Sequence, residues 1–133
     1  MDTMQEIFRR WRRYTGDVKA TLGGHVLNLK ILESPREHQA GFMNKPEPDT
    51  TFGLYFVYPS SAVRGFWMKN VPFDLDLLGF DDKMRLFEVI HLKAGDETER
   101  RLSKPCRHVL ELRRGFCASH GITPGMVLEI DGS

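Results

Sequence analysis

Five side chains between residues 67 and 76 have types and spacing that could recognise or transform a polar molecule: Trp67, Lys69, Asn70, Asp74 and Asp76. On an extended strand alternate side chains share a face, which puts Trp67 beside Lys69 and Asp74 beside Asp76. An aromatic ring, an ammonium, an amide and two carboxylates could together bind a sugar or another small polar molecule. Two neighbouring carboxylates could also act as acid and base, because close like charges raise one of their pKa values. Asp74 and Asp76 are therefore the candidate catalytic residues.

The same segment also has a purely structural interpretation. The two carboxylates would lie on a solvated strand face or pair with Lys69 and Arg64, and Asn70 would form a turn. Phe66 and Met68 alternate with the polar positions, so they would face the core and leave only half of this segment for a ligand. Both interpretations stay open at this point.

A second cluster combines two cysteines with two histidines: Cys106, His108, Cys117 and His120. Each Cys–His pair shares a face, one pair on a predicted strand and the other in a predicted helical turn. Four such side chains would suit tetrahedral zinc. Their spacing matches no standard zinc module, and buried free cysteines and core histidines account for the same residues. We therefore expect no metal and no cofactor, with these four residues as the alternative zinc ligands.

Residues 3–14 are predicted to form an amphipathic helix whose apolar stripe is flanked by arginines. The stripe could pack on the rest of the chain and leave the arginines in solvent. The helix could instead bind a partner protein, because Trp and Arg are favoured at interface hot spots. The arginines could also contact phosphates while the Trp ring stacks on a base. The candidate partner-binding residues are Arg9, Arg10, Trp11, Arg12 and Arg13.

Composition excludes several classes of protein. A chain of 133 residues with 41% apolar and 28% charged residues is globular in composition and fits one domain. The formal net charge of +1 argues against a global electrostatic attraction to nucleic acid. No apolar run approaches the ~20 residues of a membrane span, and the first six residues lack the apolar region of a secretory signal. We therefore expect a cytoplasmic protein without membrane contact.

The elements that must position these side chains are short. Residues 17–32 are predicted to form a hairpin around Gly23-Gly24. Ser34 and Glu37 form a capping-box pattern with Pro35 at the first helical position, and the short helix that follows should end at Gly41. Residues 44–50 are predicted to be a polar loop.

From residue 51 onward the pattern predicts strands. We expect them at 51–58 (closed by Pro59-Ser60-Ser61), 64–69, 73–80, 84–92, 107–113 and 126–130, with a loop at 93–105 and one helical turn at 115–120. Closely spaced strands with two or three short helices predict an α+β fold, built on a curved, mainly antiparallel sheet or partial barrel. We divide the chain into an N-terminal helix or extension, residues 1–16, and a single domain, residues 17–133.

Several strings of residues carry a family resemblance. They are Gly41-Phe42-Met43, residues 52–58, Phe66-Trp67-Met68-Lys69-Asn70, residues 72–76, residues 109–112 and residues 120–125. In this order they resemble domain-of-unknown-function family 192, over roughly residues 17–131. The family has no agreed biochemical function, so the resemblance implies a fold and a candidate surface rather than a reaction.

Two functions from different classes fit these observations. The first is a non-catalytic binding or interaction module, or a subunit of a larger assembly. Its surface around Trp67–Asp76 would hold a small polar ligand or a peptide, and its N-terminal helix would contact a partner protein. The second is a hydrolase of a sugar-like polar substrate, with Asp74 and Asp76 as acid and base and with Lys69 and Asn70 orienting the substrate. The hydrolase requires carboxylates that converge in a concave pocket, whereas the module does not.

Overall fold

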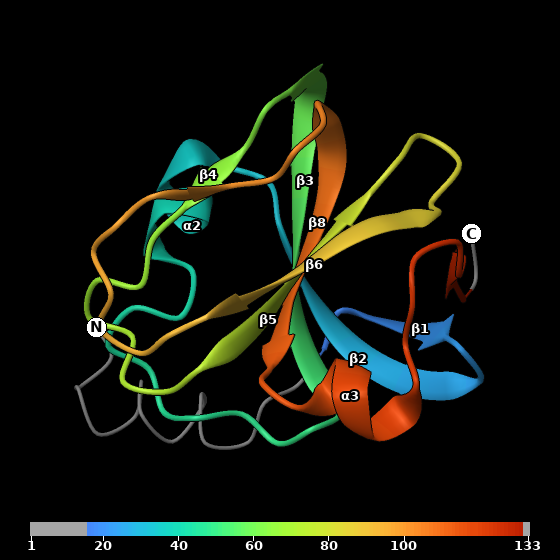
Figure 1. Ribbon diagram of the computed structural model, residues 1–133, viewed down its shortest axis with the longest axis horizontal. Coiled ribbons are helices and arrows are strands. Elements are labelled where there is room, and N and C mark those ends of the chain that lie inside the picture. The colour runs from blue at the N-terminus through green and yellow to red at the C-terminus, as the bar shows by residue number, and fades with distance from the viewer. Residues whose placement is uncertain (1–15, 132–133) are drawn as a thin grey trace.

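The computed structural model describes residues 16–131, which form a curled β-sheet accompanied by two short helices (Figure 1). The sheet has seven strands in the order β6-β5-β8-β3-β2-β1-β9. Their bounds are β1 Val18–Leu22, β2 His25–Leu32, β3 Phe52–Ala62, β5 Leu75–Phe80, β6 Leu86–Leu92, β8 Cys106–Arg113 and β9 Leu128–Ile130. A separate pair consists of β4 Gly65–Phe66 and β7 Arg100–Arg101, and the helices are α2 Pro35–Ala40 and α3 Phe116–His120.

The sheet is mainly antiparallel and curls until its two outer strands approach each other. The pairing of β2 with β3 is parallel, and the other strand pairs are antiparallel. Arg85, next to β6, forms an isolated bridge with Val127, next to β9, and the Leu86 N–H donates to the Met126 carbonyl at 2.8 Å. The predicted curved sheet or partial barrel is thus present as a half-barrel. Because its two helices are only six and five residues long, the described chain is mainly β rather than evenly α+β.

Two of the predicted local motifs are confirmed in detail. Gly23 and Gly24 connect β1 and β2 with φ angles of 57° and 81°, the left-handed conformation that a tight hairpin turn requires at both positions. Ser34 caps α2: its Oγ accepts from the Glu37 N–H at 3.1 Å, and Glu37 Oε1 accepts from the Ser34 N–H at 2.9 Å. The helix ends at Gly41, as expected.

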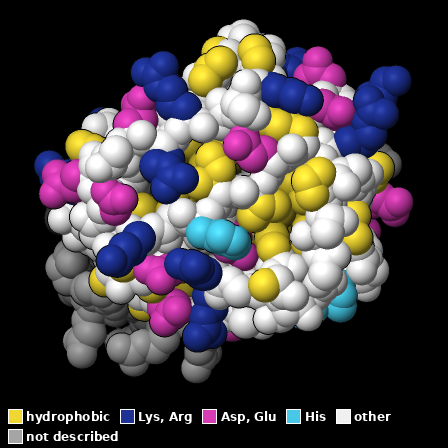
Figure 2. Space-filling view, viewed as in Figure 1, with side chains coloured by type: hydrophobic (Ala, Val, Ile, Leu, Met, Phe, Trp, Pro, Cys, Tyr) yellow, Lys and Arg dark blue, Asp and Glu magenta, His cyan; other side chains and the backbone are white. Residues whose placement is uncertain are grey.

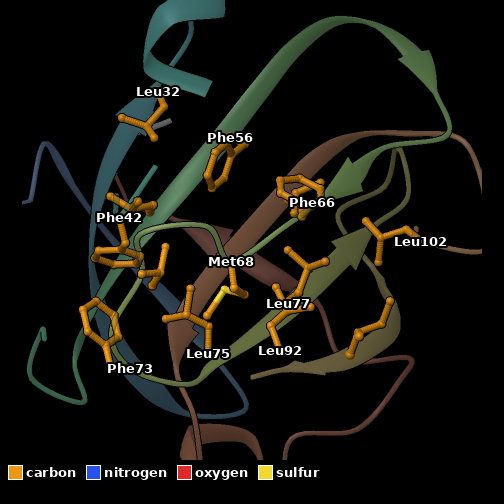
Figure 3. Packing of buried hydrophobic residues seen from close by; sticks show 14 of the residues in the cluster. Leu32, Phe42, Phe56, Phe66, Met68, Phe73, Leu75, Leu77, Leu92 and Leu102 are labelled. Atoms are coloured by element: carbon orange, nitrogen blue, oxygen red, sulfur yellow. The ribbon is translucent and has the colours of Figure 1, made fainter. Parts of the chain in front are cut away.

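Buried apolar side chains form two clusters on opposite faces of the sheet. The inner cluster draws on all seven strands of the sheet, through residues such as Ala20, Leu78 and Leu128, so it fills the interior of the curl. The outer cluster lies between β2, β3, β5, β6 and β8 and the segments that cover them. Figure 3 shows the outer cluster, with Phe56 pointing toward Phe66 and with Met68 near its middle. Both faces of the central strands are therefore covered, which explains why every residue of β5 is buried.

Several predicted boundaries were wrong, because long-range pairing decides them. Strand β3 continues past Pro59 to Ala62, since its pairing with β8 passes from Val57 directly to Ala62 and requires no N–H from the proline. The strand predicted at 64–69 is reduced to Gly65–Phe66, and the loop predicted at 93–105 contains its partner strand, Arg100–Arg101. Asp74 precedes β5, which begins at Leu75.

No helix within residues 16–131 is long and apolar enough to cross a membrane. The helix predicted at residues 3–14, with its partner-binding candidates, lies outside the described residues.

Candidate functional site

A pocket of about 240 Å³ lies between α2, the turn that follows it, and the outer face of the sheet. Aromatic side chains form much of its wall. Its lining residues come from three parts of the chain: His38, Gln39, Ala40, Gly41, Phe42 and Met43; Phe56, Tyr58, Gly65, Phe66, Trp67 and Val71; and Glu111. The helix and the β4 segment cover the sheet on the same side (Figure 1), so residues distant in sequence meet here.

Glu111 is a buried carboxyl in the wall of this pocket. It lies on β8 opposite Leu54 of β3 and Leu77 of β5, so it shares the outer face with Val109 and with apolar neighbours. Glu111 is only 4% exposed, and burial raises the pKa of its carboxyl to about 8. None of the hydrogen bonds and ion pairs within residues 16–131 involves this carboxyl. At neutral pH it is therefore predominantly protonated, with hydrogen-bonding capacity available to the pocket.

Gly41 keeps the space in front of this carboxyl open. A Cβ atom built on Gly41 would lie 3.6 Å from Glu111 Oε1 and 3.6 Å from the Phe56 ring, so a longer side chain would grow into the pocket. Gly41 also has a φ of 44°, which L side chains rarely adopt, because it turns the chain sharply at the end of α2. The glycine thus serves both the helix end and the access to Glu111.

The aromatic wall is held by its own contacts. The His38 ring lies 4.2 Å from the Tyr58 ring, and its Nε2–H donates to the Leu32 carbonyl at 2.8 Å. Phe56 and Phe66 pack edge to face at 5.4 Å. Burial raises the pKa of Tyr58 to about 12, so its hydroxyl stays neutral and can both donate and accept a hydrogen bond.

Comparison with known proteins places the chain in a family. The family model described as Uncharacterized ACR, domain-of-unknown-function family 192, matches residues 18–130. The chain belongs to this family. A search of functionally curated proteins finds no match.

Two crystal structures are similar to this member of the family. One is a protein of unknown function from Novosphingobium aromaticivorans DSM 12444, with a TM-score of 0.79 and 27% identity over 84% of this chain and 83% of that one. The other, from Sinorhizobium meliloti 1021, is described as a "putative transcription regulator"; its TM-score is 0.82, with 22% identity over 91% of this chain and 99% of that one. At that identity the second likeness concerns the fold alone.

The family segment Phe66–Asn70 contributes one side chain of the predicted ligand surface to the pocket. Trp67 is 42% exposed and lines it, while Phe66 and Met68 are buried, as the predicted alternation requires. The Lys69 ammonium lies 5.4 Å from the Trp67 ring centre, at a distance typical of a cation–π contact. Asn70 has a φ of 59°, and its carbonyl accepts from the Asn44 N–H, so it forms a turn and is not among the lining residues.

Asp74 and Asp76, the predicted acid and base, have different surroundings. Asp74 is partly exposed; its Oδ1 accepts from the Ala94 N–H at 2.8 Å, and its Oδ2 lies 3.6 Å from Arg114 Nη1. It borders a separate, open recess of about 580 Å³ with Phe73, Glu47 and Arg113. Asp76 instead lies on β5 with 0% exposure. Neither residue lines the pocket that contains Glu111.

The Asp76 carboxylate accepts hydrogen bonds from two distant parts of the chain. His91 Nδ1 lies 2.7 Å from its Oδ1, and its Oδ2 accepts from the Gly115 and Cys117 N–H groups, each at 3.2 Å. The prediction that this residue shares a solvated strand face with Asp74 is wrong, because α3 and β6 cover it. Its position ties the start of α3 to β5 and β6.

The four alternative zinc ligands are also dispersed. Cys106 belongs to the outer cluster and Cys117 to the inner one, and burial is the main cause that raises the pKa of both thiols, in Cys117 to about 12. His108 Nδ1 lies 2.7 Å from the Tyr55 hydroxyl, and His120 Nδ1 lies 2.9 Å from a backbone carbonyl of its own helix. Residues 16–131 contain no group of three or more His, Cys, Asp or Glu side chains that could hold a metal.

Charged side chains of both signs are interspersed on the face shown in Figure 2. Within the described residues several charged side chains form ion pairs, including Arg85 with Asp81 and Arg107 with Asp82. This face therefore offers no continuous basic surface to a nucleic acid.

Sequence reasoning did not single out Glu111, although it belongs to a family string. Alternation along β8 assigns Glu111 to the face opposite Leu110 and Leu112, which resembles an ordinary solvated position. The face is buried only because α2 and the β4 segment fold over it. The available signal was indirect: a strand whose neighbours, such as Phe52–Tyr58, are apolar at almost every position has both faces covered.

Proposed function

We propose that this protein is a ligand-binding module. Its pocket takes a small ligand, or one side chain of a partner, that has an apolar body and a single polar group. The apolar body packs against the aromatic wall near Trp67, and the polar group reaches the Glu111 carboxyl. The observation that carries this proposal is a buried carboxyl without a described partner that opens into a pocket.

Burial of the Glu111 carboxyl has an energetic cost. A buried polar group without a hydrogen-bond partner costs free energy, and a Leu or Met at position 111 would avoid the cost among apolar neighbours such as Leu54 and Leu77. A ligand that supplies the partner recovers part of this free energy on binding. Such pockets, mainly apolar with one or a few polar groups, are the usual form of small-molecule sites.

The pocket dimensions limit the ligand. Its volume of about 240 Å³ lies just below the roughly 300–1,000 Å³ of pockets for drug-sized molecules, so it suits a small molecule or one side chain. Trp67 at its edge is the element that this site shares with the ligand surface expected from the sequence. The alternative of a hydrolase using Asp74 and Asp76 gains no support from their contacts, because the two carboxyls serve different partners.

The test is a binding screen with small fragments that represent cations, neutral amides, anions and hydrocarbons, followed by amide NMR. We expect at least one class to shift the signals of Gly41, Glu111 and the Trp67 indole at millimolar concentration. Ala40→Leu, which adds volume within the pocket, should abolish these shifts. Ala94→Leu, the same substitution in the separate open recess, should preserve them. If no class shifts the pocket signals, or if Ala40→Leu leaves the shifts unchanged, the proposed function is wrong.

A further inference from the structure

Resting on the binding function proposed above, we infer that the ligand's polar group is an alkylammonium: a positively charged nitrogen on a short aliphatic stem. The ammonium would pair with Glu111, and the stem would lie against the aromatic wall. A free amine and a lysine side chain both offer this chemistry.

The composition of the pocket wall disfavours an anion. The wall contains one carboxyl, Glu111, and no Lys or Arg among the described lining residues. The faces of Phe56, Phe66 and Trp67 carry negative electrostatic potential, which attracts cations and repels anions. A phosphate or carboxylate ligand would therefore meet a carboxyl and electron-rich rings, with no Lys or Arg among the lining residues.

Arg64, a cation beside the pocket wall, already has partners within the chain. The Arg64 guanidinium lies 3.8 Å above the Tyr58 ring, its Nε–H donates to the Cys106 carbonyl, and its Nη2 contacts the Ser60 carbonyl. This arrangement shows that an aromatic ring of the wall accepts a cation on one face. It also fixes Arg64 through backbone oxygens, so that Glu111 has no described cation of its own.

An ammonium fits the carboxyl better than a neutral amide does. Its N–H groups are all donors, and they match the oxygens of a deprotonated carboxyl. Aromatic faces add an attraction for the positive charge that an amide would lack. Gly41 leaves the space beside Glu111 Oε1 into which such a group can enter.

Binding of the cation must be coupled to release of a proton. Burial raises the pKa of the free carboxyl to about 8, so at pH 7 the ammonium binds by displacing its proton. Affinity should then rise about tenfold per pH unit below the pKa and level off above it.

Other titratable groups around Glu111 must be separated from this effect. They are His38 on α2, Tyr58 on β3, Cys106 on β8 and the Arg64 guanidinium above the Tyr58 ring. Burial raises the pKa values of Tyr58 and Cys106, and the guanidinium stays charged throughout, so these three keep their charge state between pH 6 and 8. His38 remains present in a Glu111→Gln control, which separates its contribution from that of Glu111.

The test compares n-butylammonium, butanamide and butyrate by calorimetry, in two buffers with different ionisation enthalpies. We expect n-butylammonium to bind best and to release close to one proton at pH 7. Glu111→Gln should abolish the proton release and the pH dependence and should weaken n-butylammonium at pH 8 by at least about tenfold. A peptide with one lysine, compared with its acetyl-lysine form, distinguishes a protein side chain from a free amine.

The outcomes separate the ligand class from the binding function. If butanamide or butyrate binds better than n-butylammonium, the pocket is a binding site but the assignment of an ammonium is wrong. If n-butylammonium binds without releasing a proton, or binds Glu111→Gln equally well, the pairing with Glu111 is wrong. If fragments of other classes bind the pocket and no amine does, the inference fails while the binding function stands.

Discussion

Asp76 and Glu111 are two buried carboxyls on neighbouring strands that face opposite sides of the same sheet. In the pairing of β5 with β8, Asp76 lies opposite Leu112 and Glu111 lies opposite Leu77. Asp76 faces the inner cluster and is bound by one imidazole and two backbone N–H groups. Glu111 faces the outer cluster and takes part in none of the hydrogen bonds described for residues 16–131. The first carboxyl has its partners in the fold, and the second has an open pocket.

Under the binding function proposed above, this difference separates a structural role from a ligand-binding one. Buried polar groups in folded proteins are almost always hydrogen-bonded, so an exception requires an explanation. Asp76 is not such an exception, because its hydrogen bonds connect α3 to β5 and β6. No fully buried side-chain N or O atom within residues 16–131 lacks a hydrogen-bond partner, so the Glu111 oxygens are open to the pocket, where we propose that a ligand pairs with them. The same type of side chain thus stabilises one face and limits the stability of the other.

The largest expected effect is the loss of the Asp76 carboxyl. Asp76→Ala leaves the His91, Gly115 and Cys117 donors without their acceptor, and removal of one partner from a buried charged network costs roughly 3–5 kcal/mol. We expect the free energy of unfolding, measured by urea denaturation, to fall by that amount. Asp74→Ala, a partly exposed carboxyl two residues away, is the control and should cost about 1 kcal/mol. Equal losses in the two variants would contradict the structural role of Asp76.

Replacement of the Glu111 carboxyl should change the free energy of unfolding in the opposite direction. In the unfolded chain the carboxyl ionises near 4.5, whereas burial raises the pKa in the folded state to about 8. Between pH 4.5 and pH 7 this difference in pKa lowers the free energy of unfolding by about 1.4 kcal/mol per pH unit. We therefore expect Glu111→Gln to stabilise the protein by about 3 kcal/mol at pH 7. The exposed Glu129→Gln is the matched control and should change stability by less than about 0.5 kcal/mol. A Glu111→Gln variant less stable than the wild type would show that the carboxyl has a partner in the unliganded protein.

The dependence of the free energy of unfolding on pH provides a second measurement on Glu111. A carboxyl whose pKa is raised by folding binds more protons in the folded state than in the unfolded state, so stability falls as pH rises. For Glu111 this contribution is fully present below 4.5 and is lost as pH rises through about 8, with a slope of about 1.4 kcal/mol per pH unit between them. Urea denaturation at several pH values should show the Glu111→Gln and wild-type curves diverging over that range. Parallel curves would contradict the raised pKa.

Local sequence signals predicted much of the fold and little of the site. The glycine turn at Gly23-Gly24 and the capping box at Ser34 depend on neighbouring residues alone, so the pattern was sufficient. The alternation along Phe66–Asn70 correctly separated buried from exposed side chains. The environments of Asp76 and Glu111 could not be predicted, because α3 and α2 cover these two positions from distant parts of the chain. Periodicity indicates which side chains share a face, but not what covers that face.

The smallest effect concerns His91, a side-chain donor to Asp76. Its ring is about half exposed, so water can replace part of what it contributes, and we expect His91→Ala to cost about 1 kcal/mol. The two backbone donors would still hold Asp76 and α3. A double-mutant cycle with Asp76→Ala, followed by urea denaturation, measures the coupling directly and should return about the same value. If His91→Ala cost as much as Asp76→Ala, the pair with the imidazole, and not the attachment of α3, would be the main role of Asp76. The contrast with Glu111 would then rest on the contact between Asp76 and His91.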